Sequence, residues 1–129
     1  MPVTRIEARR TRTRDEVQAL IEAVYTAQRE ALRLPEWDRQ IRYTEYHSDF
    51  FQIIPGRTDN YVLVEITLFS GRSLDTKKSL YQNIVQRLGQ LGISEMDVTI
   101  ILYEVPAENW GIHGGLPASE VDLGFKVDI

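Results

Sequence analysis

The chain has 129 residues, of which 43% are hydrophobic and 26% are charged, a composition that favours one folded domain and excludes a disordered chain. Its 15 basic and 19 acidic residues leave a net charge of −4, so the sequence provides no global positive field to hold nucleic acid or an anionic membrane. Cysteine is absent, which excludes disulfides and cysteine-ligated metals, and two histidines, His47 and His113, are too few for a metal cluster.

The N-terminal segment MPVTRIEARR lacks the apolar core of a signal peptide, and no stretch approaches the roughly 20 apolar residues that a membrane-spanning helix needs. We therefore expect a cytoplasmic protein with a single domain over residues 1–129, and no membrane or nucleic-acid partner. A basic run over residues 9–14 is followed at once by Asp15 and Glu16. This pattern favours a solvated loop over a phosphate or nucleic-acid patch.

The first half of the chain predicts a strand, a helix and a second strand. Residues 2–8 alternate weakly between apolar and polar side chains, as a strand does. Thr13 and Glu16 form a capping box, in which each side chain can satisfy the backbone N–H of the other, and this predicts a helix start. Apolar residues then recur on one helical face, at Val17, Leu20, Ile21, Val24, Ala27 and Ala31. The helix should end before Pro35, and the second strand is expected over residues 41–47.

The second half predicts the same order of elements. Residues 50–60, FFQIIPGRTDN, indicate a hairpin-like excursion, and residues 61–69, YVLVEITLF, indicate the strongest strand, apolar enough to be covered on both faces. Ser73 can cap a second helix with an apolar face formed by Leu80, Tyr81, Ile84, Val85, Leu88 and Leu91. Residues 97–105 predict a fourth strand, and residues 121–127 a small edge strand.

The two halves of the chain register at a constant offset of 60 residues, which pairs Thr13 with Ser73, Leu20 with Leu80, Val24 with Ile84, and Ala31 with Leu91. This offset indicates an internal repeat of βαβ units over residues 2–47 and 61–105, followed by a C-terminal segment over residues 106–129. Because crossover connections share one hand, the predicted fold is an α+β two-layer sandwich, with a four-stranded sheet and both helices on one face. The other face would be bare and apolar, and we therefore expect an oligomer.

Duplicated βαβ units behind a Met-Pro start resemble the tautomerase superfamily, whose members use an N-terminal proline. The segment MPVTRIEARRTRTRDEVQAL resembles the opening strand and helix of that superfamily. LPEWDRQIRYTEYH is similar to the "VPxxDRxQ…H" segment of the malonate semialdehyde decarboxylase branch, and FSGRSLDTKK with ENWGIHGG is similar to its arginine and "DWSFGxG" segments. The resemblance implies a tautomerase or MIF-like fold, a homotrimer, a small oxo-acid substrate and no cofactor or metal.

The same resemblance implies which side chains form the site. Pro2, Asp38 and Arg72 would be catalytic. The substrate-binding residues would be Ser70, Trp110 and Ile112. The sequence departs from the branch at two positions, because Ser70 stands where a second arginine often occurs and Ile112 stands where an aromatic residue is expected.

Pro2 carries the proposed chemistry only if Met1 is removed. Removal exposes a secondary amine, and a free α-amine titrates near about 7.7 to 8.0, so this group could act as a neutral base or as a cationic acid. If Met1 remains attached, the Pro2 nitrogen is an amide and cannot titrate. We expect Asp38 to hold the Pro2 ammonium, raise its pKa, and orient water or substrate.

The residues themselves leave structural alternatives open. Asp38 follows a helix, where aspartate is also a routine turn residue, and only the resemblance favours catalysis. Arg72 follows the strongest strand and precedes a helix N-terminus, a place suited to gripping a carboxylate, but it could equally be a surface arginine in a turn. Trp110 is either a pocket wall or an ordinary packed aromatic. His47 is expected to be structural.

The leading hypothesis is an enzyme that acts on a small oxo acid and resembles malonate semialdehyde decarboxylase. Hydratase and keto–enol tautomerase activities would use the same residues, so they accompany that hypothesis. The alternative is a binding or signalling module that keeps the fold without turnover, which the missing second arginine motivates. A nucleic-acid-binding domain is disfavoured by the net charge.

Overall fold

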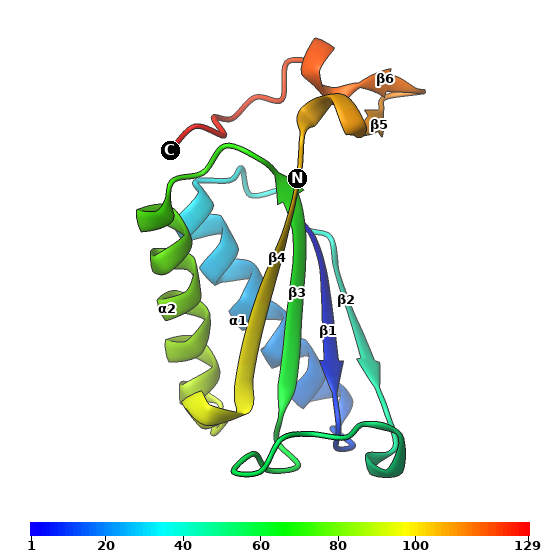
Figure 1. The fold of residues 1–129 in the computed structure, drawn as a ribbon, viewed down its shortest axis with the longest axis vertical. Coiled ribbons are helices and arrows are strands. Elements are labelled where there is room, and N and C mark those ends of the chain that lie inside the picture. The colour runs from blue at the N-terminus through cyan, green and yellow to red at the C-terminus, as the bar shows by residue number, and fades with distance from the viewer.

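The computed structural model describes residues 1–129 and has two layers, a four-stranded sheet and a pair of helices (Figure 1). The main elements follow in the order β1 (Val3–Ala8), α1 (Arg14–Leu32), β2 (Ile41–Glu45), β3 (Val62–Phe69), α2 (Leu74–Gln90) and β4 (Val98–Val105). Both helices cover the same face of the sheet (Figure 1). This confirms the predicted α+β sandwich of duplicated βαβ units.

The strand order β2-β1-β3-β4 places the two halves of the chain side by side. β1 runs parallel to β2, β3 runs parallel to β4, and β1 and β3 meet antiparallel in the middle of the sheet. In this register Arg5 lies opposite Glu65, its own partner at the 60-residue offset. A local two-fold axis therefore passes between Arg5 and Glu65 and relates one half to the other.

The helix starts lie where the capping signals predict them. Thr13 caps α1 in a complete capping box with Glu16, and the Ser73 hydroxyl caps α2 by accepting from the Thr76 N–H at 3.2 Å. The inward faces of both helices pack on the sheet, and their fully buried apolar residues are Leu20, Val24, Ala27, Leu32, Leu80, Ile84 and Leu88. The predicted apolar face of the second helix does not extend to Leu91, which lies just beyond α2 and is 44% exposed. Neither helix has the length and apolar character needed to cross a lipid bilayer.

The uncovered face of the sheet is confirmed, but it is not uniformly apolar. On β3, alternate residues face the helices and are fully buried, namely Val62, Val64, Ile66 and Leu68. Glu65 lies on the opposite face, where its carboxylate pairs with Arg5 at 2.6 Å. Ile101 and Tyr103 on β4 are exposed beside them. Within this chain β3 is therefore covered by helices on one face only, and its open face mixes apolar and charged side chains.

Two expected elements are wrong. Residues 50–60 form no hairpin, because β1 lies between β2 and β3 and the connection must cross the end of β1. Residues 121–127 form no strand, since Gly124 adopts φ +77° and interrupts the extended backbone. A short hairpin occurs earlier instead, in which β5 (Gly111–Ile112) pairs with β6 (Leu116–Pro117) and projects beyond the end of β4 (Figure 1). Its turn uses positive φ angles over residues 113–115.

The basic run over residues 9–14 is also not a solvated loop. Arg12 is only 8% exposed, and its guanidinium donates to the Tyr43 hydroxyl at 3.3 Å and to the Asn60 carbonyl at 3.2 Å. Arg9 pairs with Asp59. These arginines join the start of α1 to the neighbouring loops, so their role is structural.

Candidate active site

Four segments that are distant in the sequence meet at one end of the sheet. β1 begins there, and because β3 and β4 run antiparallel to β1, both of these strands end there. α1 also ends and α2 also begins at this end (Figure 1). The topology therefore brings together Pro2, Asp38 and Arg72, which the sequence had proposed as catalytic.

Asp38 lies against the N-terminal amine of the chain. Its Oδ2 accepts from the Met1 ammonium at 2.6 Å, and Asp38 is only 5% exposed. The Asp38 N–H donates to the Pro35 carbonyl at 3.1 Å, so the residue also occupies a turn. Pro2 is buried one residue further along the chain. In this chain the Met1 amine takes the contact that the sequence had assigned to the Pro2 amine.

The surroundings favour the neutral form of an amine at this place. Burial lowers the pKa of the Met1 amine below its ordinary value of 8.0, and the Arg72 charge acts in the same direction. The hydrogen bond and charge of Asp38 raise the pKa, as expected, but burial outweighs them. The net shift of the Met1 amine pKa is therefore downward, and the effect of Asp38 on a Pro2 amine stays a prediction.

Arg72 is a buried cation with free hydrogen-bond donors. It is 5% exposed, and its Nη1 donates to the Phe69 carbonyl at 3.1 Å. Its Nε and Nη2 groups are buried and have no partner in the chain. Burial lowers the pKa of the Arg72 guanidinium, and the charges of Asp38 and Glu104 oppose this shift. Because unpaired buried donors are costly, Arg72 is suited to an anionic ligand that supplies acceptors.

Sequence reasoning missed two charged residues next to Arg72. Glu104 lies near the end of β4, directly opposite Leu68 of β3, and the Lys77 ammonium of α2 contacts its Oε1 at 2.6 Å. The alternation of β4 could have revealed Glu104, because that register places a carboxylate on the helix-facing side of an otherwise apolar strand. Lys77 had no such signal, since lysine in the first turns of a helix is usually a solvated residue.

The three expected substrate-binding residues lie in different surroundings. The Trp110 ring packs 4.7 Å from the Phe69 ring, and its Nε1 donates to the Val105 carbonyl at 3.1 Å, so Trp110 lies over the loop that carries Arg72. Ser70 is exposed in the same loop. Ile112 belongs to β5, in the projecting hairpin and away from the chain start (Figure 1). The structure therefore brings Trp110 and Ser70 near Arg72 but not Ile112.

The last residues of the chain return over the Arg72 loop. The Ser73 N–H donates to the Ile129 carbonyl oxygen at 2.8 Å. A methyl group added at Gly71 would lie 3.1 Å from the Val127 side chain, and Gly71 has φ +135°, which favours glycine. The expected edge strand over residues 121–127 is therefore replaced by a segment that covers one side of the site.

An arginine and an aspartate also lie at the opposite end of the sheet, but there both side chains find hydrogen-bond partners within the chain. Arg12 stands 60 residues before Arg72, and Asp97 stands 59 residues after Asp38. Asp97 is 2% exposed and accepts from the Thr58 N–H at 2.7 Å and from its hydroxyl at 2.5 Å. Arg12 bonds Tyr43 and Asn60. These groups are satisfied inside the chain, whereas those of Arg72 are not.

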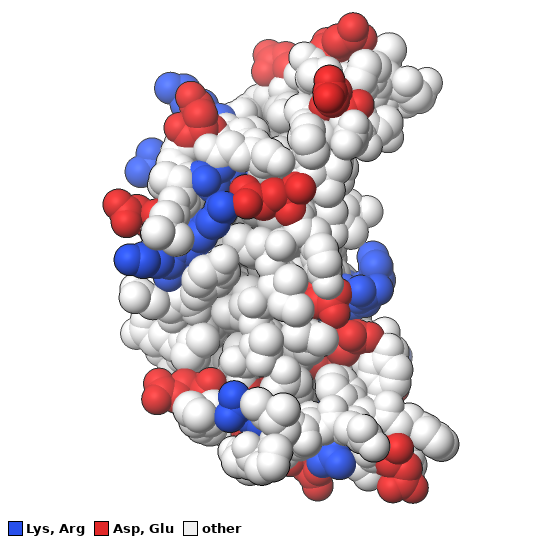
Figure 2. Space-filling view, viewed as in Figure 1, with Lys and Arg blue, Asp and Glu red and all other residues white.

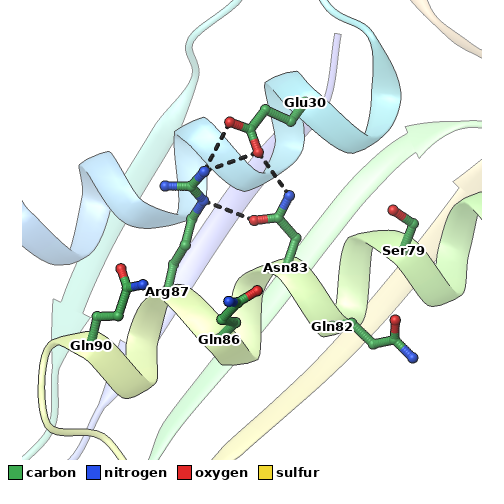
Figure 3. Close-up of a pocket in the computed structure, with 7 residues that line it drawn as sticks. All are labelled: Glu30, Ser79, Gln82, Asn83, Gln86, Arg87 and Gln90. Atoms are coloured by element: carbon green, nitrogen blue, oxygen red, sulfur yellow. Dashed lines mark hydrogen bonds and ion pairs between the residues drawn. The ribbon is translucent and has the colours of Figure 1, made fainter.

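A separate groove on the helix surface is less suited to chemistry. Seven polar residues line it (Figure 3): Glu30, Ser79, Gln82, Asn83, Gln86, Arg87 and Gln90. Glu30 accepts from Arg87 at 2.8 Å and from Asn83 at 3.0 Å. Glu30, Asn83 and Arg87 thus bond one another, and none of the seven residues has a buried side-chain donor without a partner.

Known proteins share this fold and much of the sequence. The family described as "Tautomerase enzyme" matches residues 38–113. The chain is 31% identical over 121 residues to the probable tautomerase YusQ of Bacillus subtilis (strain 168), covering 89% of this chain and 95% of that protein. A solved malonate semialdehyde decarboxylase, FG41, inhibited by 3-bromopropiolate, has a TM-score of 0.79 and 27% identity, covering 88% and 90% of the two chains.

A fused 4-OT solved as a symmetric trimer has a TM-score of 0.79 and 23% identity, covering 91% of this chain and 96% of the other, a likeness that shows the fold alone. The family match spans more than half of the chain, and the YusQ alignment spans nearly all of both proteins. The resemblance carried by the Met-Pro start and the duplicated units is therefore confirmed. The chain belongs to the tautomerase superfamily.

Proposed function

We propose that the chain, once Met1 is removed, is a cofactor-independent enzyme that moves a proton on a small 2-oxo acid. The observation that carries this proposal is the buried Arg72 guanidinium, whose Nε and Nη2 are unpaired beside the chain start and Asp38. A guanidinium with two free N–H groups matches a carboxylate, which accepts two parallel hydrogen bonds. Arg72 would hold the substrate carboxylate while the Pro2 amine works on the adjacent carbons.

In this reaction the enol and keto forms of the substrate interconvert. Toward the enol, the neutral Pro2 amine takes a proton from the carbon next to the carbonyl group, and the carbonyl oxygen takes a proton from solvent water as the carbon–carbon double bond forms. Toward the keto form, the protonated amine returns its proton to carbon and the enol hydroxyl releases its proton to solvent. Asp38 would orient the amine, since its carboxylate already binds the N-terminal ammonium at this place.

One observation and one physical argument favour proton transfer over decarboxylation. Burial lowers the pKa of the Met1 amine, and we expect burial at the same end of the sheet to favour the neutral form of a Pro2 amine. An ion pair with Arg72 would stabilise the substrate carboxylate in the ground state, and decarboxylation would have to break this pair because the carboxylate leaves as neutral carbon dioxide. Chemistry that keeps the carboxylate intact therefore fits this site better than its loss.

Decarboxylation of a 3-oxo acid is the second candidate. It is supported by the 27% identity to a malonate semialdehyde decarboxylase over most of both chains. For that reaction, the Pro2 amine would be cationic, and Pro2 and Arg72 together would stabilise the enolate charge that develops as carbon dioxide leaves.

A homotrimer is the assembly proposed for the chain. The open sheet face, with exposed Ile101 and Tyr103 on β4, offers a surface for another subunit. The fused 4-OT of similar fold is a symmetric trimer. Light scattering at micromolar concentration should give three times the chain mass, and a monomer would contradict the proposal.

The test uses protein whose loss of Met1 is verified by intact mass. Phenylpyruvate ketonisation and malonate semialdehyde decarboxylation are measured for the processed chain and for a Pro2→Ala variant. Ketonisation that depends on Pro2 supports the leading proposal, and decarboxylation alone supports the second candidate. Absence of turnover in a folded, processed chain contradicts both and favours a binding module.

A further inference from the structure

We propose that Lys77 and Glu104 are positioning residues that keep the Arg72 guanidinium free for a carboxylate ligand. The inference rests on the proposed function only for the chemical class of that ligand, an organic carboxylate. It assigns a role to an ion pair that belongs to neither the predicted catalytic set nor the predicted substrate-binding set.

The ion pair joins β4 to α2, the helix that follows the Arg72 loop. Glu104 of β4 lies directly opposite Leu68 of β3. The next residue of β3 is Phe69, whose carbonyl oxygen accepts a hydrogen bond from Arg72. The Lys77 ammonium contacts Glu104 at 2.6 Å, and basic and acidic side chains meet between α2 and β4 on the face shown in Figure 2. The Lys77 and Glu104 side chains are 22% and 33% exposed. The pair is thus partly shielded from water, which strengthens it relative to a fully solvated pair.

Two carboxylates act on the charge of Arg72, and each of them is held by another cation. Asp38 binds the N-terminal ammonium at 2.6 Å, and Glu104 binds Lys77 at the same distance. Both carboxylates act electrostatically on Arg72, yet neither hydrogen-bonds it. The free donors of Arg72 therefore exist because its two nearby anions are already engaged.

Charge counting gives the consequence of losing Lys77. With the amine neutral, as the proposed base requires, the cluster has two cations (Arg72 and Lys77) and two anions (Asp38 and Glu104), so its charges balance. Without Lys77 the cluster carries one net negative charge that repels a carboxylate, and Glu104 becomes an unpaired anion near a guanidinium whose Nε and Nη2 have no partner. A carboxylate is a preferred partner for such a fork, so Glu104 would compete with the ligand for Arg72.

A double-variant experiment separates this role from direct contact between Lys77 and the ligand. Propanoate, which cannot react, is titrated into Met-processed protein and followed by amide NMR shifts. We expect Lys77→Ala to weaken propanoate binding about tenfold, the scale of losing a charge-assisted interaction. Adding Glu104→Gln should restore binding to within about threefold of the parent, because the competing charge is gone. Lys77→Arg should bind like the parent.

Lys78→Ala is the matched control, since Lys78 is the next residue of α2, is exposed and makes no ion pair, and it should leave binding unchanged. Binding that stays equally weak in the double variant would overturn the inference and show that Lys77 contacts the ligand itself. Parent-like binding by Lys77→Ala would also overturn it. Failure of the proposed function has a different signature, in which propanoate binds the parent but phenylpyruvate is not turned over.

Discussion

Arg5 and Glu65 lie opposite each other at the centre of the sheet, and their side chains pair at 2.6 Å on its uncovered face. The hydrogen bond from Arg5 is the main cause that lowers the pKa of the Glu65 carboxyl. A carboxyl whose pKa is lower in the folded state contributes stability above its unfolded pKa, and that contribution is lost as pH falls through the folded pKa.

Glu65→Gln should therefore lower the free energy of unfolding at pH 7. The difference from the parent should shrink as the pH falls from 4.5 through the lowered pKa of the folded state, because the folded parent carboxyl then becomes protonated as well. Urea unfolding at pH 7 and at pH 3 measures both effects. Glu22→Gln breaks the exposed Arg39–Glu22 pair and is the control, with little expected change at either pH.

Replacement of Arg72 should separate stability from function. Arg72→Met breaks one hydrogen bond to the Phe69 carbonyl but removes a buried charge and two buried nitrogens without partners, so the free energy of unfolding should rise by about 1 kcal/mol or more, while turnover of an oxo acid is lost. Arg12→Met is the matched control at the opposite end of the sheet. It breaks bonds to Tyr43 and Asn60, so it should destabilise the fold by about 1 to 3 kcal/mol. Thermal unfolding of both variants tests the contrast, and a stability loss in Arg72→Met would contradict it.

The pH dependence of turnover should reflect the N-terminal amine. If the neutral Pro2 amine is the base, kcat/KM rises with pH as the amine loses its proton, and the midpoint should lie below the ordinary value of 8.0 because burial lowers the pKa at this place. Asp38→Asn removes an influence that raises the pKa, so the midpoint should move to lower pH. An upward movement of the midpoint would contradict the assigned role of Asp38. Direct titration of the proline nitrogen by NMR measures the same pKa.

Gly71 and Gly89 provide a pair of glycine substitutions with opposite expected signs. Gly71→Ala forces a side chain into φ +135° and against Val127, so it should destabilise the fold by about 1 to 3 kcal/mol and loosen the C-terminal segment. Gly89 lies within α2 with nothing near its added methyl group, so Gly89→Ala should be neutral or stabilise by up to about 1 kcal/mol. Thermal unfolding and proteolysis of residues 121–129 check both expectations.

The elements of the fold could be predicted because their signals are local. The capping box at Thr13, the cap at Ser73 and the apolar periodicity of each helix depend on residues within a few positions of one another. The 60-residue offset between the two halves then indicated two βαβ units that share one four-stranded sheet. The strand expected over residues 121–127 failed for a reason that is also local, since Gly124 takes a conformation that its apolar neighbours do not reveal.

The site could be predicted only in part, because its contacts are tertiary. Resemblance to a family placed Asp38 and Arg72 correctly beside the chain start, but no pattern in the sequence indicates that Glu104 and Lys77 meet next to them. The same resemblance grouped Ile112 with the site, whereas the structure places β5, which contains Ile112, in the hairpin that projects beyond the end of β4. Pairings between distant strands and helices decide these placements.

The internal two-fold means that the arginine and aspartate of the candidate site have counterparts at the other end of the sheet. Arg12 and Asp97 occupy the places of Arg72 and Asp38, but the chain continues through that end of the sheet and supplies every partner they need. The internal repeat thus gives the two ends of one sheet different properties. At one end Arg12 and Asp97 find their partners within the chain, whereas at the other the Nε and Nη2 groups of Arg72 stay unpaired and could bind a ligand from outside.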